Sequence, residues 1–273
     1  MHPMLNIAVR AARRAGDVII RHLHEVDQLQ VDSKQRNDFV TEVDHLAENE
    51  IIREIRRHHR DHAILAEESG ASGDNENVWI IDPLDGTTNF LHGFPVFAVS
   101  IAHQHRGRLE NGVIYDPVSQ ELFTASRGNG AFLNDRRIRV SQRRGLEGAL
   151  ISTGFPYRDH RWLDEYLAMF RAVLEKTAGL RRPGSAAIDL AWLAAGRTDG
   201  FWEMGLSPWD IAAGALLIRE AGGMVGDLSG GPEYLDQGHI IAGNPKVFRA
   251  LAREIRPHIP AELSNGSAEK PGR

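Results

Sequence analysis

The stretch WIIDPLDGTTNF, from Trp79 to Phe90, constrains this chain more than any other. An apolar run that is typical of a buried strand ends in two aspartates three positions apart, with a proline between them. On one straight strand such residues face opposite sides. In our interpretation Pro83 halts the strand and favours a turn, and a β-turn brings its first and fourth residues to within about 7 Å. The pattern therefore predicts that the carboxylates of Asp82 and Asp85 share one small volume.

Two carboxylates at such a short distance repel, and one of them stays protonated unless a cation lies between them. The chain has no cysteine, and the natural cation for an all-oxygen cluster is Mg²⁺. Gly86 lets the backbone approach a ligand closely. Thr87 and Thr88 can open a helical turn whose free N–H groups attract an anion such as phosphate. Together these contiguous residues predict a site for a phosphate ester.

Two further acidic segments extend the predicted site. Glu67 and Glu68 end the preceding predicted strand, in HAILAEES, and a neighbouring strand end would place at least one of them beside Asp82. Asp210, in SPWDIAAG, occupies the first turn of a predicted helix, and its partners would be distant in sequence.

Each element also has a simpler explanation. Asp210 could be the third-position carboxylate of a capping box opened by Ser207, and for Thr41 and Asp44 the capping box is the favoured interpretation. The Asp-Pro and Asp-Gly pairs in this stretch are common turn formers. Glu68 is interpreted as a solvent-facing neighbour rather than a ligand. Only the joint occurrence of these elements favours a metal site.

Haloacid-dehalogenase-type phosphatases also carry Asp, Gly and Thr after a strand, but their two aspartates are two positions apart. That spacing places a nucleophile and an acid/base on the same side of an extended chain. Here the spacing is three, with Pro83 between the aspartates. The spacing argues against a phospho-aspartate mechanism.

The composition excludes several other classes of protein. The 273 residues are 42% hydrophobic and 25% charged, which is typical of a globular chain of one large or two modest domains. The net charge of -5 argues against a general nucleic-acid or anionic-membrane surface, and the basic stretch 135–144 is interpreted as a solvated hairpin and loop rather than a binding site. No apolar run approaches the roughly 20 residues that span a bilayer. We expect a cytoplasmic protein whose first segment is a core-packing helix rather than a transit peptide.

The chain changes character near residue 145. Before it we expect helices over 3–25 and 42–58, a polar loop over 32–39, short strands and a β-meander. After it helices and strands alternate. The expected division is an N-terminal α+β half over 1–145, a C-terminal α/β half over 146–259 and a frayed tail over 260–273. Helix and sheet layers stacked together are the expected architecture.

At these residues the sequence resembles the inositol monophosphatase family, and among its members the bacterial inositol-1-monophosphatases. WIIDPLDGTTNF matches the first metal-binding motif of that family, and WDIAAGALLIREAGG matches the second. The segments AEES, NDFVTEVD and GSAAIDLAWLAAGRTDGFWE also fit. The resemblance covers about residues 5–256. It implies an α-β-α-β-α sandwich like that of fructose-1,6-bisphosphatase, usually as a homodimer, and lithium-inhibited hydrolysis of a phosphomonoester with two or three Mg²⁺ ions.

The resemblance also implies roles for individual residues. The metal ligands would be Glu67, Asp82, Asp85, Asp210 and the carbonyl of Leu84, with Asp85 bridging two metals. Gly86 and Thr87 would hold phosphate through their N–H groups, and Glu67 and Thr87 would orient the attacking water. Glu203 would contact inositol hydroxyls, in a pocket lined by the loop at Ser185 and Ala186. Lys34 and Asp44 would lie near a third, weaker metal.

The substrate and a second role stay open at this stage. Inositol 1-phosphate is the first hypothesis, with fructose 1,6-bisphosphate, a nucleotide 3′-phosphate or histidinol phosphate as alternatives within the same chemistry. The carboxylate of Glu203 favours a neutral polyol, because it accepts hydrogen bonds from hydroxyls and repels a second phosphate. Bacterial relatives of this type are also associated with the transcription machinery and ribosomal RNA synthesis, so a regulatory role with a partner from that machinery is the hypothesis from another class.

Overall fold

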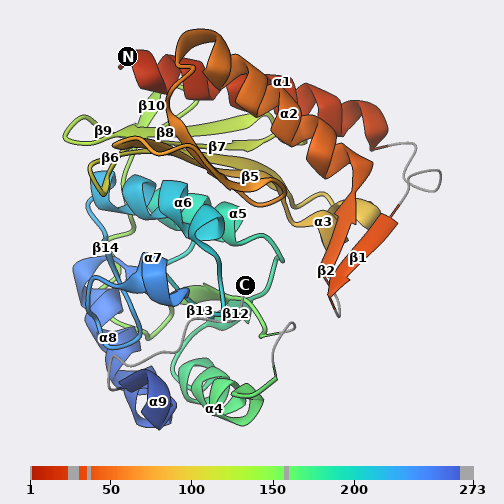
Figure 1. Cartoon of the computed structure of the whole chain (residues 1–273). Helices are drawn as coiled ribbons and strands as arrows, with labels where there is room; N and C mark the ends of the chain where they lie inside the picture. The colour runs from red at the N-terminus through yellow and green to blue at the C-terminus, as the bar shows by residue number, and fades with distance from the viewer. Residues whose placement is uncertain (1, 24–30, 36–37, 157–159, 265–273) are drawn as a thin grey trace.

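The computed structural model describes residues 2–23, 31–35, 38–156 and 160–264. Its layers are stacked as helices, a large sheet, helices, a smaller sheet and helices again (Figure 1). The predicted α-β-α-β-α sandwich is therefore confirmed. Within the described residues no helix is long and apolar enough to cross a bilayer.

Two long helices form the first layer. Helix α1 (Pro3–His22) and helix α2 (Glu42–His58) pack against each other and against the large sheet. Alanines of α1 face the sheet, which lets the helix approach it closely. Helix α2 begins where the sequence predicts, since Thr41 and Asp44 form a reciprocal capping box.

The large sheet has eight strands. These are β3 (Ala63–Ala66), β4 (Gly70–Ser72), β5 (Asn77–Asp85), β6 (Ala98–His105), β7 (Arg108–Asp116), β8 (Glu121–Ser126), β9 (Gly130–Leu133) and β10 (Arg136–Ile138). Their order is β10-β9-β8-β7-β6-β5-β3-β4, and within it only β3 and β5 run parallel. The predicted meander is confirmed as the run from β6 to β10. The parallel pair brings the ends of β3 and β5 to one edge of the sheet, which matters for the site.

The middle layer consists of two short apolar helices, α5 (Ala186–Ala194) and α6 (Pro208–Glu220). They lie between the large sheet and the smaller one, and most of their residues are buried. A helix that is apolar on all sides is the type expected for a layer covered on both faces.

The smaller sheet has the order β12-β11-β13-β15-β14. Its strands are β11 (Leu150–Thr153), β12 (Gly179–Arg181), β13 (Gly200–Met204), β14 (Met224–Gly226) and β15 (His239–Gly243). Strand β11 runs parallel to β12 and β13, and β15 pairs antiparallel with β13 and β14. Helices α4 (Leu163–Leu174) and α8 (Pro245–Ile255) form the last layer. The short helices are α3 (Thr87–Leu91), α7 (Tyr234–Gln237) and α9 (Ala261–Ser264), with a 3-10 turn at Arg256–His258.

Two expectations about local structure are wrong. The segment expected to be a polar loop contains an antiparallel hairpin of β1 (Val31–Gln35) and β2 (Asp38–Thr41). Pro83 does not end its strand, because β5 continues to Asp85. Within the expected frayed tail, α9 follows Pro260 and buries Leu263 against the outer core, and residues 265–273 lie outside the described part of the chain. Tertiary packing determines such local structure, and the periodicity of apolar residues along the chain does not predict it.

The division at residue 145 stays a prediction. The central hydrophobic cluster contains residues from both sides of it, including Ile114 and Phe123 of the large sheet and Leu190 and Leu216 of α5 and α6. The two halves thus share one core, and the candidate site lies where α5 and α6 meet the large sheet.

Candidate metal centre

Asp82 and Asp85 lie on β5 where its pairing with β6 is irregular. Asp82 is opposite Ser100 and Asp85 is opposite Ala98, so three steps along β5 match two steps along β6. Pro83, which has no N–H to donate, lies inside this β-bulge. The extra residue in the bulge shifts by one the alternation of side chains between the two faces of the sheet. Positions 82 and 85 therefore face the same volume. The predicted proximity is confirmed, but a bulge rather than a turn produces it.

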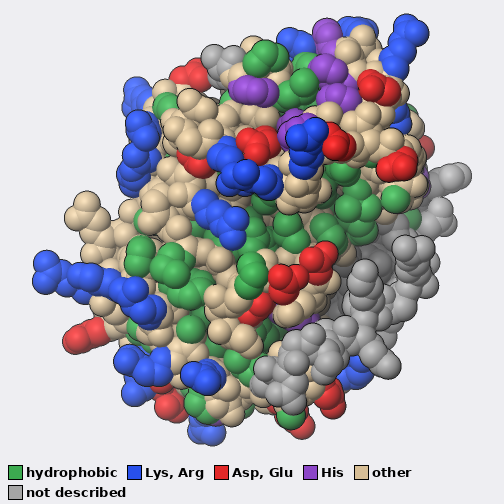
Figure 2. All heavy atoms as spheres, turned by 60° about the vertical axis from the view of Figure 1, so that its left-hand side comes forward, with side chains coloured by type: hydrophobic (Ala, Val, Ile, Leu, Met, Phe, Trp, Pro, Cys, Tyr) green, Lys and Arg blue, Asp and Glu red, His purple; other side chains and the backbone are tan. Residues whose placement is uncertain are grey.

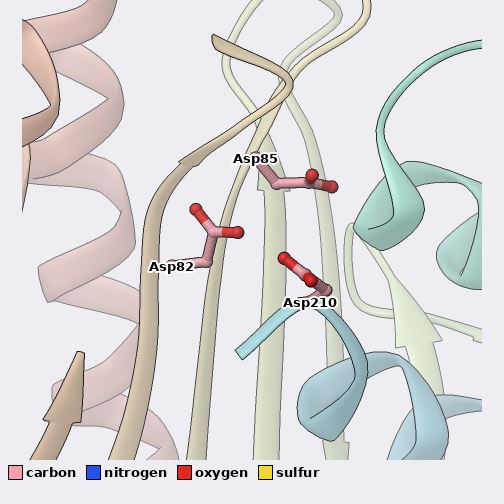
Figure 3. Close-up of side chains that lie close together, drawn as sticks. All are labelled: Asp82, Asp85 and Asp210. Carbon is pink, nitrogen blue, oxygen red and sulfur yellow. The ribbon is translucent and has the colours of Figure 1, made fainter. Parts of the chain in front are cut away.

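Asp210 reaches the same volume from α6. Its Oδ2 accepts a hydrogen bond from the Ser207 N–H at 2.6 Å, in the predicted capping box. The Oγ of Ser100, the residue opposite Asp82, donates to the Trp209 carbonyl at 3.1 Å and holds the first turn of α6 beside the bulge. Ligand atoms of Asp82, Asp85 and Asp210 lie within 4.8 Å of one another, and Figure 3 shows the three carboxylates converging.

The electrostatics of this cluster call for a cation. Burial raises the pKa of Asp82 well above its usual range, and the neighbouring carboxylates of Glu67, Asp85 and Asp210 raise it further. An all-oxygen set of three converging carboxylates is the donor set that a hard divalent cation prefers. Among the residues that the structure describes, no other group of three acids, histidines or cysteines brings its ligand atoms so close together.

Glu67 lies beside Asp82, as the strand ends predict. Its N–H donates to the Ile81 carbonyl at 3.1 Å, across the parallel β3–β5 pair, and its side chain hydrogen-bonds to Asp82. It is outside the group of three that lies within 4.8 Å. Glu68 is half-buried rather than fully exposed.

Glu48 of α2 is a site residue that the sequence motifs do not indicate. Although it is 3% exposed, its two carboxylate oxygens each accept a backbone N–H bond at 2.9 Å, from Glu68 and Ser69. It thereby fixes the backbone that follows Glu67. A glutamate on the buried side of an amphipathic helix was the available signal, because such a carboxylate needs donors.

The turn after Asp85 has the geometry that Gly86 predicts. Gly86 has φ 97°, and a Cβ there would lie 2.9 Å from the Val96 carbonyl, so only glycine fits. Thr87 opens α3, and its Oγ1 lies 2.9 Å from Asp44 Oδ1 and 3.1 Å from the carbonyl of Leu84. The next residue of α3, Thr88, is exposed.

Asp44 serves two purposes. Its Oδ2 accepts from the N–H and hydroxyl of Thr41, at 2.8 and 2.7 Å, while its Oδ1 accepts from Thr87. The capping interpretation is confirmed, and the same carboxylate orients a residue of the site. Lys34, which the resemblance places nearby, lies in β1, and its side chain is outside the described part of the chain.

The start of α5 holds Asp85. Ser185 caps this helix, and its Oγ donates to Asp85 Oδ2 at 2.5 Å. The N–H of Ala187 donates to the same oxygen at 2.7 Å, a contact that no local motif indicates because the two residues are 102 positions apart. These two donors fix the orientation of the Asp85 carboxylate beside the cluster. Ala186, the first residue of α5, is buried.

Glu203 lies on β13 and is 7% exposed. Its carboxylate occupies the space beside Gly154, which directly follows β11. It also faces Asp189 of α5, and burial together with Glu203 raises the pKa of Asp189 well above its usual range. Glu203 therefore lies between α5 and the end of β11.

Comparison with known proteins matches this arrangement. The model of the inositol monophosphatase family matches residues 1–260. A protein of Pseudomonas aeruginosa named Nus factor SuhB is 57% identical over 269 residues, which is 96% of this chain and 99% of that protein. The crystal structure of the extragenic suppressor protein SuhB from Bartonella henselae has a TM-score of 0.91 and 48% identity, covering 93% of this chain and 99% of that one. An inositol monophosphatase from Anabaena has a TM-score of 0.85 and 42% identity, covering 95% of this chain and 97% of that one.

The layered fold, the acidic cluster and these matches support a phosphatase of a generally metal-dependent class. Within that class, the chain belongs to the inositol monophosphatase family, as the resemblance indicated.

Proposed function

We propose that this protein is a Mg²⁺-dependent phosphomonoesterase that hydrolyses myo-inositol 1-phosphate to inositol and phosphate. The observation that carries the proposal is the convergence of Asp82, Asp85 and Asp210 beside the turn at Gly86 and Thr87. Mg²⁺, bound as two or three ions, supplies Lewis-acid polarisation of the phosphate and a more acidic bound water. These three aspartates, together with Glu67 and the carbonyl of Leu84, would hold it.

The chain's own residues position the reactants. The single proton of the Thr87 hydroxyl is committed to Asp44 or to the Leu84 carbonyl, so this oxygen can only accept a further hydrogen bond. It would accept one from the attacking water and, together with Glu67, aim the water at phosphorus. The N–H groups of Gly86 and Thr87 donate to the phosphate oxygens, where negative charge accumulates.

The polyol end of the substrate meets Glu203. As a buried carboxylate outside the cluster of three aspartates, it would accept hydrogen bonds from hydroxyls and disfavour a second phosphate. This supports a polyol monophosphate over fructose 1,6-bisphosphate or a nucleotide 3′-phosphate. Ser185 and Ala186 line the same pocket in this proposal.

The test is a panel of phosphomonoesters ranked by kcat/KM, with Mg²⁺ titration and Li⁺ inhibition. The Asp85→Asn variant should lose hydrolysis and keep the fold, because an amide oxygen can still accept from Ser185 and Ala187. Near-normal turnover of this variant in saturating Mg²⁺ would refute the metal assignment. A panel that prefers a nucleotide or a bisphosphate would refute only the substrate.

We also propose that the protein is a homodimer. Large apolar side chains of α4 are exposed at Leu163, Leu167 and Leu174, with 36%, 51% and 46% of their surface accessible. Positions four and seven apart lie on one helical face, and contiguous exposed apolar surface marks an interaction site. Light scattering on the full chain should give twice the monomer mass, and Leu167→Glu should reduce it.

A second role, in transcription and ribosomal RNA synthesis, is supported by the name Nus factor given to the relative from Pseudomonas aeruginosa. Such a role would use surface outside the carboxylate pocket. A pull-down of transcription proteins with wild type and Asp85→Asn separates the two functions: retained binding by an inactive variant shows that the role needs no catalysis.

A further inference from the structure

We propose that a basic groove binds a compact anion with two or more phosphate groups. The groove lies at the end of the smaller sheet away from the candidate metal centre. The basic groove consists of two hollows of ≈790 and ≈580 Å³ that share the wall formed by residues 144–147. Volumes of this size are typical of sites for small ligands.

The basic groove is separate from the candidate metal centre. Asp199 lines it directly before β13, whereas Glu203 lies four residues further along the chain, within that strand. Four residues of strand span about 13 Å. Likewise β11 begins beside the groove at Leu150 and ends at Thr153, next to Gly154 and Glu203. The two sites are thus at opposite ends of the same strands.

The lining of the basic groove is rich in cations. Three segments supply it: the link between the two halves of the chain, the residues that follow α4, and α8. The cations are Arg143, Arg144, Lys176, Lys246, Arg249 and Arg253, and the carboxylates are Glu147, Asp199 and Glu254. Six cations against three carboxylates leave three positive charges in excess, in a chain whose net charge is -5.

Most of these cations have no carboxylate partner. Arg143 pairs with Asp199 at 3.6 Å, and Arg253 pairs with Glu254 at 3.7 Å. Within the described ranges, the side chains of the other four, Arg144, Lys176, Lys246 and Arg249, make no ion pair or hydrogen bond with the protein. On α8 the cations at 246, 249 and 253 are three and four positions apart and so share one face of the helix. Figure 2, which brings the α8 side forward, shows Lys and Arg side chains projecting from the lower part of the surface.

The walls of the basic groove are held in place by Asn244. Its side-chain amide donates to the carbonyls of Ser141 and Arg143, both at 2.9 Å, and its Oδ1 accepts from the N–H groups of Lys246 and Val247. This one side chain ties the link to the first turn of α8. Preorganised walls lower the entropy cost of binding. Because Asn244 occupies the N–H groups of that turn, the side chains and not the helix terminus provide the anion contacts.

The chemistry of the lining selects the ligand. It contains no aromatic side chain, so there is no surface on which nucleic-acid bases could stack. Carboxylates interrupt the positive charge, which disfavours a long polyanion lying across the surface. Clustered guanidinium and ammonium groups instead suit a short anion whose phosphate groups accept several charge-assisted hydrogen bonds.

The test is calorimetric titration of the full chain with inorganic tripolyphosphate in EDTA. Without metal the carboxylate centre repels the anion, and the Asp85→Asn variant should bind as the wild type does. Lys246→Gln/Arg249→Gln should weaken binding at least about tenfold, since each lost charge-assisted contact accounts for roughly that factor. The matched control, Arg53→Gln/Arg57→Gln, removes two charges from an exposed face of α2 and should change binding less than about twofold.

Equal losses in the two double variants would overturn the proposal, because they would show a response to net charge alone. Absence of tripolyphosphate binding by the wild type would overturn it too, and so would loss of binding in Asp85→Asn. A structured RNA that binds through Lys246 and Arg249 while tripolyphosphate does not would replace the compact anion with a nucleic acid. None of these outcomes depends on phosphatase activity, so failure here is distinct from failure of the proposed function.

Discussion

Replacing Gly154 by alanine should displace Glu203 and weaken recognition of a polyol substrate. A Cβ at position 154 would lie 1.9 Å from Glu203 Oε1, 2.1 Å from its Cδ and 2.3 Å from Oε2. Both residues are buried. Glu203 lies on β13, and Gly154 directly follows β11, the parallel neighbour of β13. Position 154 therefore has to be glycine for the Glu203 carboxylate to stay where it is. The expectation for activity rests on the proposed contact between Glu203 and substrate hydroxyls.

The magnitude follows from the size of the overlap. A new methyl group needs a separation above 3 Å from the carboxylate, so Glu203 has to move by about 1 Å, which is enough to break a hydrogen bond. A hydrogen bond to a charged group contributes roughly 1.5–3 kcal/mol. One such loss lowers kcat/KM by about ten- to 150-fold. Overpacking of the buried site should also destabilise the fold by about 1–3 kcal/mol.

The assay compares two substrates. With myo-inositol 1-phosphate, Gly154→Ala should show the full loss, mainly in KM. With p-nitrophenyl phosphate, which has no polyol hydroxyls, the loss should be less than about threefold. The double variant Gly154→Ala/Glu203→Asp should recover part of the activity, because aspartate is shorter by one methylene and leaves room for the new methyl group.

Three results would refute this reasoning. Wild-type kcat/KM on inositol 1-phosphate in Gly154→Ala would show that Glu203 need not stay in place. Equal losses on both substrates would show a general disturbance of the site rather than lost polyol recognition. A double variant weaker than either single variant would contradict the steric explanation. Urea unfolding of each variant checks that the protein is folded under the conditions of the assay.

Three further outcomes are expected. Mg²⁺ at 100 times its dissociation constant should raise the free energy of unfolding by about 2.7 kcal/mol. Asp82→Asn should abolish this increase and stabilise the metal-free protein, because it removes a charge that burial and neighbouring carboxylates disfavour. Calorimetric melts with and without Mg²⁺ check both results. Burial lowers the pKa of His103 from 6.5 to about 4, so the unfolded chain binds a proton at this residue at a higher pH than the folded chain does. The contribution of the neutral ring to the free energy of unfolding is therefore complete above pH 6.5 and is lost as the pH falls towards 4, by about 3 kcal/mol at most. In urea titrations, His103→Gln should reduce this dependence of the free energy of unfolding on pH. Ser185→Ala removes the hydroxyl that donates to Asp85 Oδ2, which should raise the Mg²⁺ concentration for half-maximal activity about tenfold without changing the fold.

The features that the sequence predicted well depend on neighbours along the chain. The capping box at Thr41 and Asp44 sets the start of α2, and the one at Ser207 and Asp210 sets the start of α6. Both signals lie within four residues and use side chains whose preference for helix starts is strong. The signal for the left-handed turn at Gly86 is equally local, because few residues other than glycine adopt the backbone conformation found there.

The features that the sequence did not predict depend on residues far apart in the chain. The hydroxyl of Ser100 contacts Trp209, 109 positions away, and that contact brings Asp210 to the bulge. The N–H of Ala187 reaches Asp85 across 102 positions. The fit of Gly154 around Glu203 appears only once β11 and β13 are side by side. Neither apolar periodicity nor a local motif predicts these contacts, because they arise only when the layers pack together.

The bulge at Pro83 shows how a correct conclusion can rest on the wrong local structure. Proline was expected to stop the strand, because it cannot donate to a ladder. The strand instead continues, since β6 pairs with Asp82 on one side of the proline and with Asp85 on the other. A turn and a bulge both place the two carboxylates in one volume, so their proximity could be predicted from spacing while the backbone path could not. What separates the two is whether a partner strand extends past the proline, and that is a property of β6.

Helix capping and a role in the site are alternative explanations for Asp44 and Asp210 in the sequence, and in the structure each carboxylate serves both purposes. In each residue one carboxylate oxygen accepts from the start of a helix, Oδ2 from Thr41 in the first case and Oδ2 from Ser207 in the second. A carboxylate fixed through one oxygen directs the other along a defined line: Asp44 Oδ1 towards Thr87, and the side chain of Asp210 towards Asp82 and Asp85. The helix N-terminus also favours negative charge, which offsets part of the repulsion within the acidic cluster. A capping aspartate is therefore a suitable residue from which to build a cation site, because the same hydrogen bond that starts the helix stabilises and orients the charge.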